Sequence, residues 1–292
     1  MARLFSEDFI RAIERLRLVA RQAPPGGLHA EHRSHDLGCG MEFRDFRAYV
    51  PGDDVRRMDW NLYRRSGRLF LRLFEAPEDL PVHILLDVSD SMFFEAPPRA
   101  DAARQMAAVI AAVALNQHDR VGIYPFGIDL VTPLAPASGK PALPRMLQYL
   151  EQLRPAGTTD LIHSTRRFAT RRQRAGLAVI ISDFFDPRGI DQVIDALRSL
   201  RHRLLLIRVV RPRDASPDLE GELRLLDCES DRSVDVSVTG DSLTRYRQAY
   251  QAFEEALSRF AARRRALHVT IDADRPVLEQ LGSVFVGGVL MT

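Results

Sequence analysis

Short apolar runs alternate with longer amphipathic stretches through most of the chain after residue 80. The runs have the length of buried strands, and the stretches between them repeat their apolar residues at helical spacing. Strands are expected near residues 82–88, 120–126, 177–181, 204–210 and 269–272, and helices near residues 99–116, 143–153, 162–172, 189–200 and 242–265. This alternation predicts an α/β fold with a Rossmann-like, doubly wound and mostly parallel sheet.

Smaller features interrupt this alternation. Residues 92–98 are expected to form a loop, and residues 130–134 are expected to pair beside the second strand as a hairpin. Two short runs, 222–227 and 233–238, predict a further hairpin near residues 221–239. We expect this hairpin to be an addition to the main domain.

A helix is expected near the start of the chain. Residues 6–22 repeat apolar side chains at helical spacing, Ser6 can cap the first turn, and Glu7 and Asp8 lie within that turn. Three histidines follow in a polar stretch: His29, His32 and His35. A transition metal would suit this spacing, but we favour solvated surface, because the histidines lie in a glycine-rich loop without cysteines among them.

Residues 38–75 form a dense segment of aromatic, arginine and aspartate residues that ends in an expected strand at residues 67–75. We expect residues 1–78 to form the N-terminal helix and a small β-rich segment packed on the main domain, which spans residues 79–292. Alternating charges suggest an ion network that pins the segment to the sheet, with a partner surface as the alternative. The charged residues are Arg44, Asp45, Arg47, Asp53, Asp54, Arg56, Arg57 and Asp59.

Composition and charge are typical of a globular protein and argue against nucleic-acid binding. Of 292 residues, 46% are hydrophobic and 27% are charged, which is ordinary for a soluble globular protein, and the formal net charge is +2. Arginine-rich stretches at residues 171–174 and 263–265 lie at expected helix ends, where arginine complements the helix dipole. They lack interleaved aromatic residues, so nucleic-acid binding is not expected.

Cysteine content and hydropathy favour the cytoplasm. Cys39 and Cys228 are too few for a disulfide framework, which suits a reducing compartment. No apolar run approaches the ~20 residues that span a bilayer. The N-terminus turns acidic at Glu7 and Asp8, unlike a signal peptide. The sequence therefore predicts a cytoplasmic protein with no direct membrane span.

Oxygen-bearing side chains follow the first central strand at Asp87, Ser89 and Ser91, and two later loops carry Thr159 and Asp183. Because the carboxyl ends of parallel strands open on one edge of a sheet, we expect these side chains to meet there. Mg2+, or another divalent cation such as Ca2+ or Mn2+, prefers such oxygen ligands. Mg2+ takes about six of them, so a position would remain open for water or for a carboxylate of another protein.

The order Asp-x-Ser-x-Ser, then Thr, then Asp resembles the metal-ion-dependent adhesion site of von Willebrand factor A domains. The preceding segment, with Gly40–Phe43, Phe46–Tyr49, Pro51–Arg56 and Asp59–Trp60, resembles the bacterial domain of unknown function 58 family. The resemblance implies a von Willebrand factor A-like fold and pairing with a MoxR-type AAA+ ATPase in a chaperone-like system. It implies no known reaction.

Carried over to this chain, the resemblance assigns the metal ligands Asp87, Ser89, Ser91, Thr159 and Asp183. Thr159 matches better than Thr158, because the family pattern places threonine just before an aspartate, here Asp160. Asp183 would often act through water. Asp90 departs from the pattern, and its charge would either tighten cation binding or point to solvent.

Two functions remain open at this stage. The first is a non-enzymatic, Mg2+-dependent protein-interaction module, and the alternative is a metal-dependent phosphohydrolase with Asp87 as nucleophile. The hydrolase would need a carboxylate two residues on and a nearby basic residue. Ser89 stands in that position, and the only lysine of the chain is Lys140. Neither Gly-x-Ser-x-Gly nor a Gly-rich phosphate loop is present, so we expect no serine hydrolase and no ATP binding.

Overall fold

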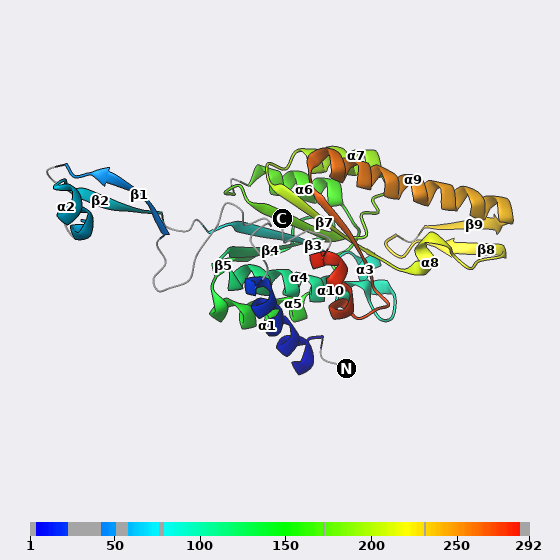
Figure 1. Cartoon of the computed structure of the whole chain (residues 1–292). Coiled ribbons are helices and arrows are strands. Elements are labelled where there is room, and N and C mark those ends of the chain that lie inside the picture. Colours follow the sequence, from blue (N-terminus) through cyan, green and yellow to red (C-terminus); the bar gives the residue numbers. More distant parts are fainter. Residues whose placement is uncertain are drawn as a thin grey trace. The chain divides into compact units, whose positions relative to one another are not determined.

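The computed structural model describes residues 4–22, 42–50, 58–75, 79–171, 173–230 and 232–286. The chain divides into two compact units, of which the larger is built from residues 1–24 and 80–291 and the smaller from residues 25–79. The larger unit carries the central sheet and all the side chains of the predicted site (Figure 1).

Six strands form the central sheet, in the order β10, β7, β6, β3, β4, β5. Their bounds are β3 Pro81–Asp87, β4 Arg120–Phe126, β5 Leu134–Ser138, β6 Leu177–Ser182, β7 Arg203–Val210 and β10 Leu267–Asp272. Neighbouring strands are parallel except at one edge, where β5 runs antiparallel to β4. The predicted α/β fold with a mostly parallel sheet is therefore confirmed.

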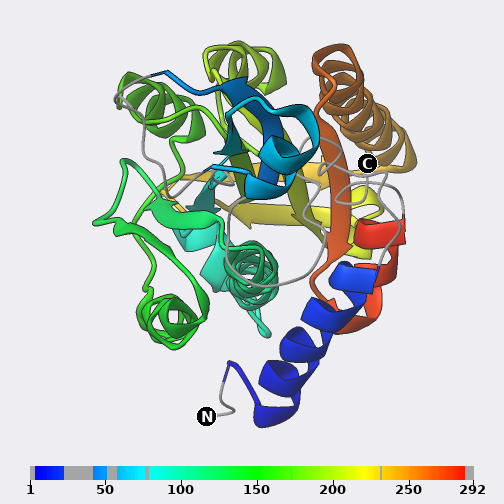
Figure 2. The same cartoon turned by 60° about the vertical axis from the view of Figure 1, so that its left-hand side comes forward.

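Helices cover both faces of this sheet (Figure 2). One face carries α1 (Glu7–Gln22), α4 (Arg99–Asn116), α5 (Leu143–Gln152) and α10 (Val277–Val286), and the other carries α6 (Leu161–Thr170), α7 (Ile190–Arg198) and α9 (Gly240–Arg264). Each face has its own buried apolar cluster. Strands covered on both faces need apolar residues at successive positions, which explains the continuous apolar run of β3.

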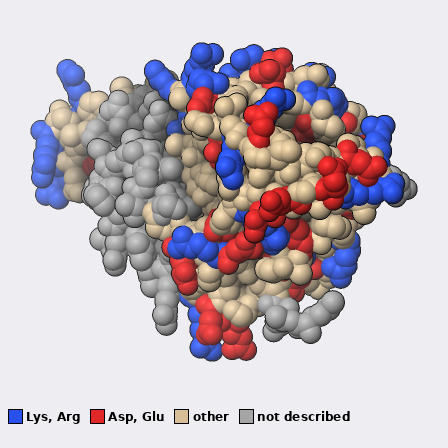
Figure 3. Space-filling view, turned by 90° about the vertical axis from the view of Figure 1, so that its right-hand side faces the viewer, with Lys and Arg blue, Asp and Glu red and all other residues tan. Residues whose placement is uncertain are grey.

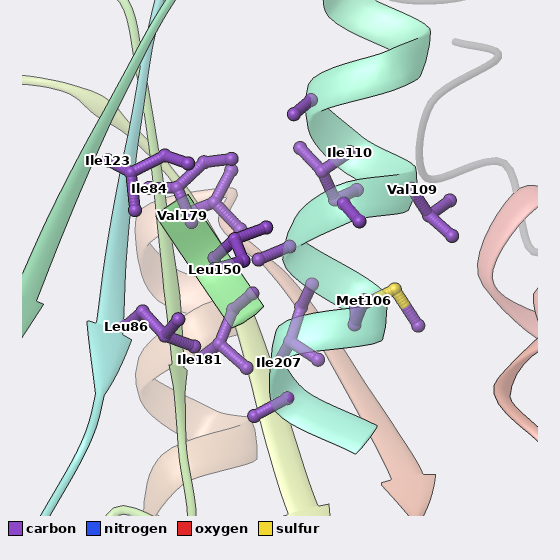
Figure 4. Packing of buried hydrophobic residues seen from close by; sticks show 14 of the residues in the cluster. Ile84, Leu86, Met106, Val109, Ile110, Ile123, Leu150, Val179, Ile181 and Ile207 are labelled. Carbon is purple, nitrogen blue, oxygen red and sulfur yellow. The ribbon is translucent and has the colours of Figure 1, made fainter. Parts of the chain in front are cut away.

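Helix α4 supplies much of the cluster on its side of the sheet. Its Met106 and Ile110 belong to the same buried cluster as Ile84, Ile181 and Ile207 of the strands (Figure 4). Alanine occupies many of its other buried positions, so the helix packs against the sheet and against its neighbours α1 and α5. Close packing of this kind holds the start of α4, and the loop that precedes it, in a fixed position.

The expected additional hairpin is present as β8 (Gly221–Leu226) and β9 (Ser233–Val238). In the described part of the chain these two strands pair only with each other. Three of their apolar side chains are exposed: Leu225, Leu226 and Val234. The hairpin is thus attached to the larger unit without extending its central sheet.

The smaller unit contains β1 (Glu42–Ala48) and β2 (Phe70–Glu75), which pair antiparallel, and helix α2 (Trp60–Ser66) between them in sequence. Asp59, expected to belong to an ion network, caps α2 by accepting two backbone hydrogen bonds from its first turn. The side chains of the other expected network members lie outside the described ones. The packing of this segment on the main domain stays a prediction.

Four α-helices differ from the expectation. Helix α3 (Asp90–Phe94) occupies the start of the segment 92–98, where a loop was expected, and it buries Met92 completely. Helices α2, α8 (Pro212–Ala215) and α10 were not expected at all. Gly282 lowers the helix propensity within α10 and weakens its signal in the sequence.

The edge strand also begins later than expected. Residues 130–134 were expected to pair with β4, but β5 starts at Leu134, and only an isolated bridge joins Leu130 to Phe126. Pro133 explains the shift, because proline lacks the N–H that a ladder requires.

Two further expectations concern the N-terminal part. Helix α1 belongs to the larger unit, although the sequence grouped it with residues up to 78. The histidines at positions 29, 32 and 35 and Cys39 lie outside the described residues.

None of the described helices is both long and apolar enough to cross a membrane.

Candidate metal centre

The predicted site lies where the connections of the sheet change direction. From β3 the chain passes through α4 to β4 on one side, whereas from β6 it passes through α7 to β7 on the other side. Such a switch point opens a crevice between the carboxyl ends of the two adjacent strands. Asp87 is the last residue of β3, and Asp183 directly follows β6, so both carboxylates border this crevice.

A tight turn after β3 arranges the next two predicted ligands. The backbone N–H of Ser89 donates to Asp87 Oδ1 over 3.0 Å, and the Ser89 and Ser91 hydroxyl oxygens are hydrogen-bonded at 3.0 Å. Asp87 and Ser89 are fully buried, whereas Ser91 is half-buried. An aspartate that accepts a backbone N–H two residues on stabilises such a turn, and it keeps both hydroxyls beside the carboxylate.

Backbone hydrogen bonds tie the Thr159 loop to this turn. Ala156 donates to the carbonyl of Val88 over 2.8 Å, and Asp90 donates to the carbonyl of Gly157 over 2.9 Å. Thr159 itself is buried. A residue far along the chain is thereby fixed beside the first ligand loop.

Two aspartates next to the predicted ligands have structural roles. Asp90 Oδ1 accepts the backbone N–H of Gly157 over 3.1 Å, so Asp90 fastens the two loops together. Asp160 caps helix α6 by accepting the backbone N–H three residues on. Thr159, rather than the half-buried Thr158, is therefore the threonine whose side chain lies within the site.

Ser182 links the loop after β6, which carries Asp183, to the turn after β3. It was not predicted as a site residue. Its hydroxyl donates to Asp87 Oδ2 over 2.6 Å and accepts the backbone N–H of Phe184 over 2.9 Å. Asp183 Oδ1 accepts the backbone N–H of Phe185 over 3.0 Å. Phe184 is fully buried with a φ of 63°, a left-handed conformation that is rare for aromatic residues. The sequence did contain a signal, because Ser182 ends its strand directly before Asp183.

The two aspartates carry buried charge without a basic partner. Burial raises the pKa of Asp87 to about 6, against the opposing effect of hydrogen bonds from Ser182 and Ser89. Burial also raises the pKa of Asp183 to about 7, and the charge of Asp87 adds to that shift. Among the described residues neither carboxylate forms an ion pair. A bound cation would favour the ionised form of both.

Arg99, whose charge acts on Asp183, is hydrogen-bonded to other carboxylates. Arg99, at the start of α4, donates to both oxygens of Asp214 over 2.7 and 2.6 Å and to Glu95 over 3.0 Å. Its charge lowers the pKa of Asp183 only as a minor contribution beside burial. Arg99 therefore stabilises the surrounding loops and leaves the negative charge of the crevice largely unbalanced.

Glu229, in the turn between β8 and β9, also reaches this site. Its carboxylate accepts the Thr159 hydroxyl over 2.7 Å, the Thr159 backbone N–H over 2.8 Å and the Ser91 backbone N–H over 3.4 Å. The sequence did not indicate Glu229. Its partners lie 70 and 138 positions away, and no spacing pattern connects residues so far apart.

The donor set suits a hard divalent cation. Within the described ranges no group of three or more His, Cys, Asp or Glu side chains is placed to hold a metal ion, so hydroxyl oxygens would have to supply part of the shell. A hydroxyl keeps acceptor lone pairs after donating its hydrogen. Asp87 and Asp183 would supply charge, and Ser89, Ser91 and Thr159 would supply neutral oxygens of the kind that Mg2+ prefers.

The structure brings the five predicted residues to one edge of the sheet. Asp87, Ser89 and Ser91 are linked through their own turn, and Thr159 shares the carboxylate of Glu229 with the Ser91 backbone. The charges of Asp87 and Glu229 both raise the pKa of Asp183. Cation binding by these residues stays a prediction.

Comparisons with known proteins bear on the family of the chain. A family model described as "Protein of unknown function DUF58" matches residues 45–259. Uncharacterized proteins of Mycobacterium bovis and Mycobacterium tuberculosis are 32% identical over 225 residues, which cover 75% of this chain and 70% of theirs.

Solved structures show more distant similarity. The conserved hypothetical protein BatB from Bacteroides thetaiotaomicron matches with 13% identity and a TM-score of 0.44, over 72% of this chain and 98% of that chain. An aerotolerance-related membrane protein from Bacteroides fragilis matches with 15% identity and a TM-score of 0.45, over the same shares of the two chains.

Proposed function

The chain belongs to the DUF58 family, and from this premise we propose that it is a non-enzymatic, Mg2+-dependent protein-interaction module with a von Willebrand factor A-like fold. In this proposal it acts as an adaptor for a MoxR-type AAA+ ATPase in a chaperone-like system. The family resemblance of its sequence motifs supplies the partner, and the site described above supports the dependence on a cation.

One observation carries the proposal: Asp87 and Asp183 are buried side by side at a switch point, and the described residues offer neither of them an ion pair. Folded proteins rarely keep such charge unless a partner or a metal balances it. The hydroxyls of Ser89, Ser91 and Thr159 complete a set of oxygen donors. Five side chains fall short of the roughly six ligands that Mg2+ requires, which leaves room for a partner's carboxylate.

The same residues give little support to a phosphohydrolase that uses Asp87 as nucleophile. The general acid that such an enzyme needs two residues on is replaced by Ser89, whose hydroxyl is bonded to Ser91. Arg99, whose charge acts on Asp183, is held by Asp214 and Glu95 and is not free to neutralise a phosphoryl group.

We place the protein in the cytoplasm as part of this proposal. Cys228 is a free and exposed cysteine. Exposed thiols persist best where the surroundings are reducing. Direct measurement of its oxidation state in cells would test this placement.

A pull-down experiment tests the adaptor function. The tagged protein should capture the MoxR-type AAA+ ATPase of the same organism in Mg2+, and a chelator or Asp87→Ala should abolish capture. Asp195→Ala, an exposed aspartate of α7 that pairs with Arg198, serves as the matched control and should bind like wild type. Capture that persists equally in chelator, for wild type and for Asp87→Ala, would refute the proposal.

A further inference from the structure

The turn of the β8–β9 hairpin brings its own carboxylate to the candidate metal centre. Glu229 accepts hydrogen bonds from the Thr159 hydroxyl and from the Thr159 and Ser91 backbone N–H groups. These contacts belong to two different ligand loops. Glu229 therefore bridges the loop that carries Ser91 and the loop that carries Thr159.

Hydrogen bonds within the hairpin turn fix the backbone at Glu229. Asp227 accepts the Glu229 backbone N–H over 3.0 Å and the Ser230 hydroxyl over 2.6 Å, and its own N–H donates to the carbonyl of Arg232 over 2.9 Å. Such closed turns restrict the backbone of the residue at their tip. The position of Glu229 is thus set by the hairpin itself and not by chance contact of a flexible side chain.

Neither strand of the hairpin has a fully buried residue. Its strands pair only with each other in the described part of the chain, and isolated two-stranded hairpins are marginally stable in water. Leu226 is 76% exposed and Val234 is 62% exposed, so these side chains anchor the hairpin to nothing else. Three hydrogen bonds of Glu229 attach the hairpin tip to the two loops, and an attachment of this size is reversible.

Charge makes this attachment depend on a cation. The charge of Glu229 acts on both Asp87 and Asp183. Acidic side chains also form a band across the face of the molecule that carries the hairpin, although the formal net charge is +2 (Figure 3). Without a positive ion these carboxylates repel one another, and with one they are held together.

We propose that Glu229 occupies the open position of the cation site from within the chain, and that an aspartate or glutamate side chain of a protein partner binds by displacing it. The inference rests on the proposed function and specifies how the site is regulated. The Glu229 carboxylate accepts hydrogen bonds from a hydroxyl and from backbone N–H groups. An acidic side chain of a partner could accept the same hydrogen bonds. The hairpin then acts as a competing ligand that keeps the site covered until such a partner arrives.

The test compares wild type with Glu229→Gln, which keeps the size of the side chain and removes its charge. Mg2+ affinity is measured by calorimetry, and hydrogen exchange of residues 221–238 is measured with and without Mg2+. We expect Mg2+ to protect the hairpin of the wild type. In Glu229→Gln the affinity should fall about tenfold and the protection should be lost. Glu222→Gln, an exposed glutamate of the same hairpin, is the matched control and should behave like wild type.

The outcomes separate this inference from the proposed function. If wild type binds Mg2+, Asp87→Asn does not, and Glu229→Gln equals wild type in both affinity and hairpin protection, then only the role of Glu229 is refuted. If wild type itself fails to bind Mg2+, both the proposed function and the inference that rests on it are refuted.

Discussion

Asp87 and Asp183 bring negative charge into the interior of the larger unit. Both side chains are almost excluded from solvent, and burial raises the pKa of each. An ionised carboxylate without a counter-ion destabilises a folded protein, whereas a bound cation reverses that effect. At the scale of single residues, the proposed cation binding would therefore be coupled to folding stability.

The first prediction concerns Asp87→Asn. The amide keeps the volume of the side chain and removes its charge, so the metal-free variant should be at least as stable as wild type at neutral pH. Wild type should gain about 2.7 kcal/mol of stability at a Mg2+ concentration 100 times its Kd, and the variant should gain none. Thermal melts in Mg2+ and in chelator measure both effects. Equal stabilisation of both proteins by Mg2+ would show that Asp87 is no ligand.

The second prediction concerns Ser182→Ala. The variant leaves one oxygen of buried Asp87 and the N–H of Phe184 without their hydrogen bonds. Unfolding should become easier by about 1–3 kcal/mol, and Mg2+ affinity should fall because Asp87 loses its orientation. Thr165→Val is the control, since the buried Thr165 hydroxyl has no hydrogen-bond partner among the described residues and its loss should cost nothing. Equal urea midpoints for Ser182→Ala and wild type would contradict this role.

At the scale of elements, the site depends on loops that approach each other closely. Gly127, just after β4, leaves no space for a side chain: a Cβ there would lie 2.4 Å from the carbonyl oxygen of Ala156. The carbonyl of Gly127 also accepts the backbone N–H of Asp160 over 3.0 Å. This approach of the loop after β4 holds the Thr159 loop in place.

The third prediction follows for Gly127→Ala. The added methyl group should push the Thr159 loop away from the strand ends, lowering stability by about 1–3 kcal/mol. Mg2+ affinity should fall as well, because Thr159 would move relative to the other ligands. Gly240→Ala is the matched control, as a Cβ there meets nothing within 4 Å. Unchanged denaturation and unchanged Mg2+ binding in Gly127→Ala would contradict the close approach.

Histidines of β3 and of the segment before β7 pack together at the opposite end of the strands from the site. The rings of His83 and His202 lie 4.8 Å apart and contact Phe168. Burial lowers the pKa of His202 to about 4, and the charge of His83 adds to the effect. Burial also lowers the pKa of His83, although its hydrogen bond to the carbonyl of Arg174 opposes the shift.

The fourth prediction is a pH dependence of stability. Between pH 6.5 and about 4 the unfolded chain, with a histidine pKa of about 6.5, takes up protons that the folded chain does not. The contribution of these histidines to the free energy of unfolding should therefore be present above pH 6.5 and decline as the pH falls toward 4. Urea denaturation at several pH values should give a shallower decline for His202→Gln than for wild type. An equally steep decline would show that His202 is protonated in the folded state.

At the scale of the whole molecule, strong patterns predicted the framework of the larger unit. Helix α4 (Arg99–Asn116) and strand β4 (Arg120–Phe126) have the bounds expected from the sequence, because long helical periodicity and short apolar runs leave little ambiguity. The sequence did not predict helix α3, which buries Met92, and it predicted strand β5 too early, because the effect of Pro133 was not recognised. Such local balances are weakly encoded in the pattern of apolar and polar residues.

The candidate site was predictable only in part. The motif indicated the candidate ligands within each loop, and the parallel sheet explained why separate loops meet at one edge. The contacts of Ser182 and Glu229 depend on the register of β6 beside β3 and on how the hairpin lies against the rest of the larger unit. Tertiary packing determines both, and no spacing along the chain specifies it.

The most direct test of the metal centre is a crystal structure with Mn2+ located by its anomalous scattering. The account predicts one Mn2+ at the carboxyl ends of β3 and β6, in contact with the hydroxyls of Ser89 and Ser91 and within direct or water-mediated reach of Asp87, Thr159 and Asp183. Absence of Mn2+ from this edge at a concentration that saturates other sites, with the hydroxyls of Ser89 and Ser91 bonded only to each other, would contradict it.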